Sequence, residues 1–210
     1  TEMHGAKEFG FLYSFFLSRC QGIIAINSLI REELRKTFRL KKEQFIVEPN
    51  GVDGTVFNTI VSRDEARRQL HLPTGEKIVV YVGRVYAWKG LEMLPGAVEQ
   101  FPQDTFLYFV GANEGDFRRI CPHDNLERIK FIGSKTQEEI ALWLRAADLV
   151  LVIGTAKNKD SYIYTSPMKV FEYLAAGCVI VASDTPAIRQ VLSEREAFFS
   201  APDDHRDLAS

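Results

Sequence analysis

Short runs of consecutive apolar residues recur along the chain, and segments with apolar residues at helical spacing lie between them. Runs of Val, Ile, Leu and aromatic residues without alternating polar positions are typical of strands that are covered on both faces of a parallel sheet. The runs predict strands over residues 22–26, 45–47, 77–82, 105–110, 129–132, 149–153, 179–182 and 197–200.

The segments between these runs carry helix signals. Helices are predicted over residues 28–38, 64–70, 116–120, 137–147 and 185–192, with a further helix that begins at Ser166-Pro167. Asn27 or Ser28 is the expected N-cap of the first helix, and Thr136 is the expected N-cap of the helix over 137–147. Pro95 lacks an N–H group, so the helix that contains it is expected to begin late or to bend. Strands that alternate with helices predict an α/β fold, a Rossmann-like parallel sheet with helices on both faces.

A turn cluster, Pro49-Asn50-Gly51-Val52-Asp53, interrupts this pattern. Proline, asparagine, glycine and aspartate each favour turns through their backbone or side-chain geometry. We therefore expect the chain to leave one layer here and to begin its next unit, which places a domain boundary near residue 50.

An aromatic run near the N-terminus, Phe9 to Leu17, has apolar residues on nearly all sides of the helix that it predicts. Such a helix needs burial, so we expect it to pack against protein on its N-terminal side. A role at a membrane surface is the alternative, although the run lacks the basic polar face typical of interfacial helices. Thr1 stands in what reads as the middle of a domain, which suggests a piece of a longer protein.

Composition is that of a soluble globular protein, with 26% charged residues and a formal net charge of -2 over 210 residues. This balance gives no electrostatic reason to expect a nucleic-acid partner. No stretch approaches the roughly 20 apolar residues that span a bilayer. Cys20, Cys121 and Cys178 form no CxxC pair, which favours reduced thiols in a cytosolic protein.

Missing motifs exclude several common classes. The chain has neither a GxGxxG segment after a strand nor a Walker GxxxxGK[ST] segment, so classical dinucleotide and P-loop sites are not expected. It has no HExxH segment, and its four histidines are too scattered to suggest a metal site. The chain has no GxSxG segment, so serine-hydrolase chemistry is not expected.

The helix that begins at Ser166 follows a buried strand and a polar loop, at the sheet edge where parallel α/β proteins bind ligands. Ser166 is expected to cap this helix and Pro167 to be its first residue. The N–H groups of Met168 and Lys169, the helix dipole and the Lys169 ammonium then form an anion site suited to a phosphate. Glu172, close to the first turns of this helix, is placed to accept hydrogen bonds from a sugar diol. An ordinary capped helix with a solvated glutamate is the alternative.

Two cations are expected at the same edge. Arg84 directly follows the strand over 77–82 through Gly83, and Lys89 opens the next helix five residues later. An arginine and a lysine that converge on a helix N-terminus neutralise a diphosphate and stabilise it as a leaving group. Two solvated surface cations are the alternative.

Three segments together resemble the retaining glycosyltransferases of family 4, also called group 1. They are PNGVD at 49–53, YVGRVYAWKG at 81–90 and SPMKVFEYLAAGCVIVASDTPAIRQV at 166–191. The resemblance covers essentially the whole chain and implies the GT-B architecture, in which two Rossmann-like domains face each other across a cleft. It implies that residues 1–50 are the tail end of the N-terminal acceptor-binding domain. Residues 51–210 are then the C-terminal nucleotide-sugar-binding domain.

The resemblance also implies roles for individual residues. Arg84 and Lys89 are the catalytic pair that holds the donor diphosphate, Glu172 binds the nucleotide ribose, and Gly133 with Ser134 lies against the base. Backbone amides around Pro167 take the distal phosphate. The substrate-binding set is Gly83, Gly133, Ser134, Ser166, Pro167, Met168, Lys169 and Glu172. Neither a metal nor a cofactor is implied, because the nucleotide diphosphate sugar is itself the donor substrate.

Tyr164 departs from the family pattern. Many members carry a glutamate eight positions before Glu172, where it contacts the donor sugar, and a tyrosine does not supply the same anionic acceptor. Together with the absence of most of the acceptor domain, this suggests that the chain binds the donor and does not act alone.

The resemblance sets the expected reaction as sugar transfer from a nucleotide diphosphate sugar with retention of the anomeric configuration. The expected acceptor is a sugar, a lipid-linked sugar or a polysaccharide in bacterial surface biosynthesis. The expected place is the cytoplasm, and a peripheral membrane contact through the N-terminal domain is allowed. Two alternatives stay open: a non-catalytic nucleotide-binding module, and another GT-B enzyme such as a sugar-nucleotide epimerase.

Overall fold

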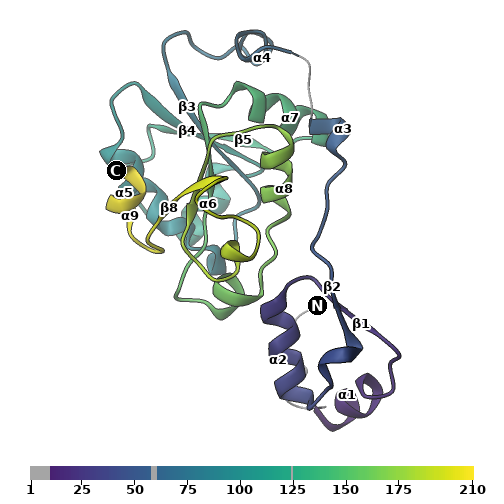
Figure 1. Ribbon diagram of the computed structural model, residues 1–210. Helices are drawn as coiled ribbons and strands as arrows, with labels where there is room; N and C mark the ends of the chain where they lie inside the picture. Colours follow the sequence, from purple (N-terminus) through teal and green to yellow (C-terminus); the bar gives the residue numbers. More distant parts are fainter. Residues whose placement is uncertain (1–9, 58–60, 124) are drawn as a thin grey trace. The chain divides into compact units, whose positions relative to one another are not determined.

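The computed structural model describes residues 10–57, 61–123 and 125–210 (Figure 1). Contacts between Cα atoms divide the chain into two compact units, residues 1–50 and residues 51–210. The two units are described separately below.

The smaller unit pairs two short strands and packs helices beside them. Its elements are α1 (Gly10–Leu17), β1 (Ile23–Ala25), α2 (Ser28–Phe38), a 3-10 helix (Lys42–Gln44) and β2 (Phe45–Val47). β1 and β2 are parallel. Asn27 is the N-cap of α2, because its side chain accepts a hydrogen bond from the Ile30 N–H at 2.8 Å. The predicted strands and the predicted cap are confirmed here.

Apolar side chains remain on the surface of this unit. Tyr13 of α1 packs against Phe38 of α2 with ring centroids 6.2 Å apart, whereas Phe16 is exposed. Ile24 and Ile46, which are register partners in the two strands, are 71% and 60% exposed. The aromatic helix is therefore only partly covered within its own unit.

The larger unit contains a six-stranded sheet in which all neighbouring strands are parallel, in the order β5-β4-β3-β6-β7-β8. The strands are β3 (Lys77–Val82), β4 (Thr105–Val110), β5 (Ile129–Gly133), β6 (Leu149–Val152), β7 (Ile180–Ser183) and β8 (Ala197–Ser200). This order is that of a Rossmann-type sheet. Successive strands are added on one side of β3 as far as β5, and from β6 onward they are added on its other side. The predicted α/β fold class is confirmed.

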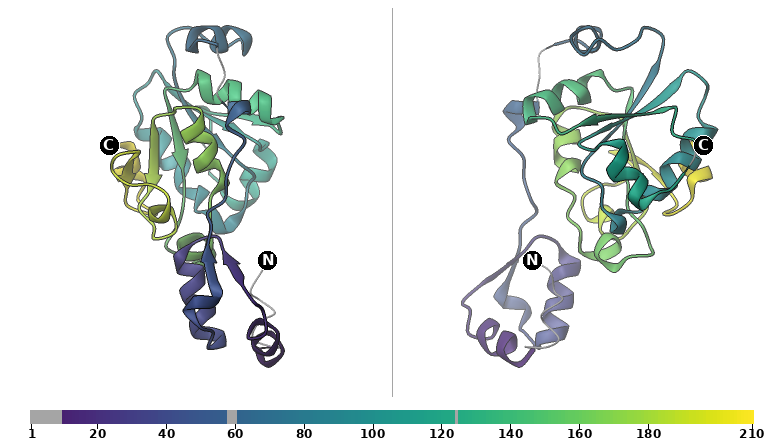
Figure 2. Two further views of the ribbon diagram at one scale, coloured as in Figure 1. Left: turned by 45° about the vertical axis from the view of Figure 1, so that its right-hand side comes forward. Right: turned by 180° about the vertical axis from the view of Figure 1, so that it is seen from behind.

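Helices cover both faces of this sheet (Figure 2). They are α3 (Gly54–Phe57), α4 (Arg63–Gln69), α5 (Leu94–Gln100), α6 (Glu114–Ile120), α7 (Gln137–Ala146), α8 (Met168–Ala175) and α9 (His205–Ala209). Alternate residues of β3 enter different cores, because successive side chains of a strand point to opposite faces. Val80 packs in the core that includes residues of α7 and α8, and Tyr81 packs in the core that includes residues of α5 and α6.

The helix ends follow their predicted signals in two places. Thr136 caps α7 and accepts from the Glu139 N–H at 3.3 Å, while the Glu139 side chain accepts from the Thr136 N–H in return. Pro95 lies in the first turn of α5, which begins late, after a 3-10 helix over Leu91–Met93. A missing N–H is tolerated at that position, since the first turn has no intrahelical acceptor for it.

The prediction of a helix over residues 185–192 is wrong. The structure has only a short 3-10 helix there, Ile188–Gln190. The Ala187 N–H donates to the Tyr162 carbonyl at 3.1 Å, and Val191 leaves helical geometry at φ -121°. A tertiary hydrogen bond thus takes a donor near the start of the segment, and the backbone angles at Val191 end it.

Candidate functional site

Three neighbouring strands end in glycines at the carboxyl edge of the sheet. Gly83, Gly111 and Gly133 follow or close β3, β4 and β5, and their φ angles are 151°, 103° and 71°. The Gly111 N–H donates to the Gly133 carbonyl at 2.7 Å. A Cβ atom at Gly111 would lie 2.8 Å from the Gly83 carbonyl oxygen, so only glycine fits. Glycine at Gly111 thus allows the ends of β3 and β4 to pack closely together.

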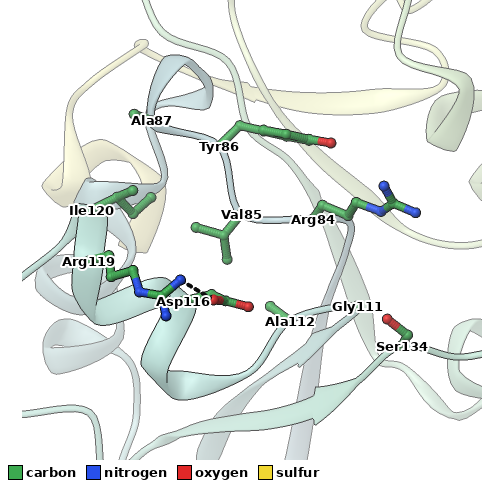
Figure 3. A pocket seen from close by; sticks show the side chains of 10 residues that line it. All are labelled: Arg84, Val85, Tyr86, Ala87, Gly111, Ala112, Asp116, Arg119, Ile120 and Ser134. Atoms are coloured by element: carbon green, nitrogen blue, oxygen red, sulfur yellow. Dashed lines mark hydrogen bonds and ion pairs between the residues drawn. The ribbon is translucent and has the colours of Figure 1, made fainter.

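A pocket of about 520 Å³ lies at this edge (Figure 3). Its lining residues are Arg84, Val85, Tyr86, Ala87, Gly111, Ala112, Asp116, Arg119, Ile120 and Ser134. The predicted site residues Arg84 and Ser134 therefore border the same cavity, although they follow different strands. Asp116 and Arg119, which form an ion pair at 2.9 Å inside this lining, were not identified from the sequence.

The helix α8 begins one residue later than predicted. Pro167 is its N-cap, with extended backbone angles of φ -72° and ψ 100°, and its carbonyl accepts from the Val170 N–H at 3.0 Å. Ser166 is therefore not the cap, because the residue whose carbonyl begins the helical hydrogen bonding is the proline. The first helical N–H groups belong to Met168 and Lys169, which agrees with the predicted donors for an anion.

The Lys169 side chain lies against the end of β3. Its Nζ is 3.9 Å from the centroid of the Tyr81 ring, and a Cβ atom at Gly83 would be 3.1 Å from that Nζ. Burial of the ammonium holds the pKa of Lys169 well below its usual range, and the positive charge of Lys89 lowers it further. The Glu172 carboxylate opposes this shift. The Lys169 ammonium thus lies in a buried place beside a second cation, Lys89.

Lys89 and Arg84 lie on the loop that follows β3. Lys89 closes a 3-10 helix, Ala87–Lys89, and its Nζ donates to the Arg84 carbonyl at 3.3 Å. Burial lowers the pKa of Lys89, and the Arg84 charge adds to that effect. Gly90 follows with φ 75°, and a Cβ atom there would meet the Thr155 Cβ at 2.7 Å. The close approach of Gly90 to Thr155 holds this loop against the loop after β6.

Glu172 lies one turn along α8 and is half-buried. Burial raises the pKa of its carboxyl, and the Lys169 ammonium lowers it. The structure thus brings together Arg84, Lys89, Lys169 and Glu172, which the sequence places on two distant segments. Lys89 and Glu172 each contribute to the pKa of Lys169, which shows that the three groups interact.

Tyr164 ends a π-helix, Asp160–Tyr164, in the loop between β6 and α8. The sequence predicted only a polar loop here. The Nζ of Lys159 lies 5.1 Å from the centroid of the Tyr164 ring. Single π-helical turns are frequent at functional sites.

No helix within the described ranges is long and apolar enough to cross a membrane. Over the same residues, no group of three or more His, Cys, Asp or Glu side chains is arranged to hold a metal ion.

Comparisons with known proteins show the family to which the chain is similar. A family model described as "Glycosyl transferases group 1" matches residues 76–210. The chain is 30% identical over 192 residues to a phosphatidyl-myo-inositol mannosyltransferase of Mycobacterium tuberculosis, covering 89% of this chain and 47% of that protein. It is 32% identical over 145 residues to a D-inositol 3-phosphate glycosyltransferase of Mycolicibacterium smegmatis, covering 66% of this chain and 31% of that protein.

Solved structures show the same fold. A sucrose-phosphate synthase from Thermosynechococcus elongatus superposes with a TM-score of 0.74 at 25% identity, over 95% of this chain and 50% of that chain. Anabaena Alr3699/HepE in complex with UDP-glucose superposes with a TM-score of 0.75 at 20% identity, over 95% of this chain and 55% of that chain. The chain spans about half the length of these proteins. Since the family model matches well over half of its residues, the chain belongs to the group 1 glycosyl transferases.

Proposed function

We propose that this chain binds the nucleoside diphosphate part of a sugar donor and that the whole protein transfers the sugar with retention of configuration. The observation that carries the proposal is the cluster of Arg84, Lys89 and Lys169 beside the start of α8. The pKa values of both lysines are lowered, partly because the cations repel one another. A diphosphate bound among them would offset that repulsion.

The roles of these groups follow from their places. Arg84 and Lys89 would neutralise the diphosphate, so that it leaves as the bond to the sugar breaks. The first N–H groups of α8 would bind the distal phosphate, because a helix N-terminus carries partial positive charge. The Glu172 carboxylate would accept hydrogen bonds from the ribose. The pocket between Arg84 and Ser134 would hold the base against the backbone of Gly133.

The two units would divide the reaction between them. Residues 51–210 would bind the donor, and residues 1–50 would belong to the part of the protein that binds the acceptor. The mycobacterial relative is named for the transfer of mannose to phosphatidyl-myo-inositol. For this chain we propose an acceptor of the same broad kind, a sugar that is free, lipid-linked or part of a polysaccharide.

Calorimetric titration with UDP, GDP and ADP tests the binding step. We expect one of the three to bind, and we expect Arg84→Ala with Lys89→Ala to weaken that binding by at least about a hundredfold, because each of the two charge-assisted hydrogen bonds contributes about 1.5–3 kcal/mol. Arg68→Ala with Lys77→Ala is the matched control, since it removes the same two charges from exposed side chains that pair with Glu65 and Asp104. Equal affinities of the two double variants would contradict the proposal.

A non-catalytic nucleotide-binding module is the second candidate, and Tyr164 is the observation that favours it. Both candidates bind a nucleoside diphosphate, so binding alone does not separate them. Release of nucleoside diphosphate from a donor sugar in the presence of an acceptor, with the product anomer assigned by NMR, would distinguish them. A donor that binds and is never cleaved would favour the module.

A further inference from the structure

We propose that aromatic rings, in place of carboxylates, position the two lysines that face the donor diphosphate, and that Tyr81 is the positioning residue for Lys169. The inference rests on the proposed function, because it concerns the same cations. It adds residues that neither the family resemblance nor the motifs single out.

The contact between Tyr81 and Lys169 is close and rigid. The Lys169 Nζ lies 3.9 Å from the ring centroid, within the range of a cation–π interaction. The Tyr81 side chain is fully buried, and its ring packs edge-on against Phe109 with centroids 4.7 Å apart and an interplanar angle of 72°. Phe109 in turn contacts Phe117 and Phe131. The ring under Lys169 is therefore held by a wider aromatic cluster.

Lys89 is held in a similar way. Its Nζ lies 4.8 Å from the Tyr86 ring centroid and 5.5 Å from the Trp88 ring centroid. The two rings stack on each other with centroids 5.9 Å apart and an interplanar angle of 23°. Each lysine of the cluster thus lies against aromatic faces that come from β3 or from the loop after it.

The two lysines have aromatic neighbours where other lysines of this unit have carboxylate partners. Among the described residues, neither Lys89 nor Lys169 forms an ion pair. Three other lysines of the same unit do pair with carboxylates: Lys77, Lys135 and Lys157. Glu172 acts on Lys169 only through its charge. The aromatic contacts therefore distinguish the two lysines of the cluster from these three, although Lys130, outside the cluster, also lies 5.4 Å from a ring centroid, that of Phe106.

The difference matters for an anionic ligand. A carboxylate partner would cancel the lysine charge and repel an incoming diphosphate. An aromatic ring attracts an ammonium through its quadrupole and carries no net charge. Rings can therefore fix the position of a cation and leave its whole charge for the ligand. This arrangement suits a site that must hold repelling cations ready for a dianion.

The hydroxyl of Tyr81 allows a sharp test. It is buried and has no hydrogen-bond partner among the described residues. Tyr81→Phe therefore keeps the ring under Lys169 and removes only the hydroxyl, whereas Tyr81→Leu and Tyr81→Met remove the ring and keep an apolar side chain. If the ring positions Lys169, the phenylalanine variant should bind like the wild type.

Calorimetry would measure the affinity of each variant for the tightest-binding nucleoside diphosphate among UDP, GDP and ADP, and for the matching nucleoside. We expect Tyr81→Leu and Tyr81→Met to weaken diphosphate binding roughly five- to thirtyfold, which runs from the value of an exposed cation–π contact to that of a desolvated one. Tyr81→Phe should stay within about twofold of the wild type. In a Lys169→Met background, Tyr81→Leu should add no further loss, because the positioned group is gone. Nucleoside affinity should not change in any variant.

Several results would overturn the inference. They are wild-type affinity in Tyr81→Leu, an equal loss in Tyr81→Phe and Tyr81→Leu, or a loss that persists in the Lys169→Met background. An equal loss of nucleoside affinity would show general damage to the fold, and a thermal melt of Tyr81→Met would check this separately. A wild-type chain that binds no nucleoside diphosphate would contradict the proposed function itself. Wild-type binding with no effect of Tyr81→Leu would contradict the inference alone.

Discussion

The two edges of the parallel sheet differ in whether the basic side chains nearest their strand ends are paired with carboxylates. At the amino edge, Asp148 accepts hydrogen bonds from Arg63 at 3.2 Å and from Arg67 at 2.7 Å. It also accepts from the backbone N–H of Ile78 at 2.7 Å. A pocket of about 400 Å³ lies at this edge, and Arg63 and Asp148 are both in its lining. The charges there are paired before any ligand arrives.

At the carboxyl edge the balance is different. Within the described residues, Arg84, Lys89 and Lys169 form no ion pair, and Glu172 is the carboxylate whose charge acts on Lys169. Both edges carry cations and both have a cavity, so neither feature alone identifies a ligand site. We propose that the unpaired charge at the carboxyl edge does. Basic residues that are matched by carboxylates stabilise the fold, and those left unmatched are available to an anion.

Asp148→Ala is expected to have the largest effect, and that effect is on stability. The change leaves the Ile78 N–H without its acceptor and removes the carboxylate partner of Arg67, whose guanidinium keeps only the carbonyls of Ala146 and Glu76. It should lower the free energy of unfolding by roughly 2–3 kcal/mol. Urea denaturation measures this loss. Nucleoside diphosphate affinity at a temperature where the variant is folded should equal that of the wild type. A large loss of affinity with little change in stability would break the comparison between the two edges.

Glu172→Gln should have a smaller effect, this time on binding. Replacing the carboxylate by a neutral amide weakens the hydrogen bonds that the ribose hydroxyls donate, so affinity should fall by about tenfold, a typical difference for one charge-assisted bond. Calorimetry with a 2′,3′-dideoxynucleoside diphosphate is the control, because that ligand lacks both hydroxyls. Its affinity should change much less than that of the ribose ligand, since only the effect of the Glu172 charge on Lys169 remains. An equal loss for both ligands would remove Glu172 from the ribose site.

The sequence predicted the parts of this molecule that depend on local patterns. Every predicted strand is present, because an apolar run carries its own signal for burial on both faces. The N-cap at Thr136 was predicted for a similar reason, since a capping box lies within four residues of sequence. The sequence also placed Arg84, Lys89 and Glu172 at one edge, because strand ends and helix starts meet there in a parallel sheet, and their roles stay a prediction.

Contacts between distant segments could not be predicted in the same way. The role of the Tyr81 ring depends on its packing beneath Lys169 and against Phe109, and its sequence neighbours give no sign of either contact. Asp116 and Arg119 were missed because an i,i+3 ion pair on a short helix looks like any solvated pair. The helix predicted over 185–192 failed because the Ala187 N–H bonds to Tyr162. Each of these features depends on tertiary structure.

The smallest expected effect is a pair of opposite pH dependences at Lys169. Its pKa lies below the usual value of 10.5 because the ammonium is buried and Lys89 repels it, while Glu172 opposes the shift. The uncharged Tyr81 ring faces it as well. Between the folded pKa and the usual one, the unfolded chain binds more protons than the folded chain. The contribution of Lys169 to the free energy of unfolding therefore rises with pH over that range.

Diphosphate affinity should change in the other direction. A bound diphosphate favours the charged lysine, so affinity should fall by about threefold to tenfold as the pH rises through the folded pKa, which is the loss expected when one ion pair is removed from a partly buried site. Lys169→Met is the control, because it removes this titration and keeps Lys89 and Glu172. Both pH slopes should be shallower in that variant, in calorimetry for affinity and in urea denaturation for stability. Identical slopes in the variant and the wild type would show that Lys169 keeps an ordinary pKa, and the unmatched charge of the carboxyl edge would then rest on Arg84 and Lys89 alone.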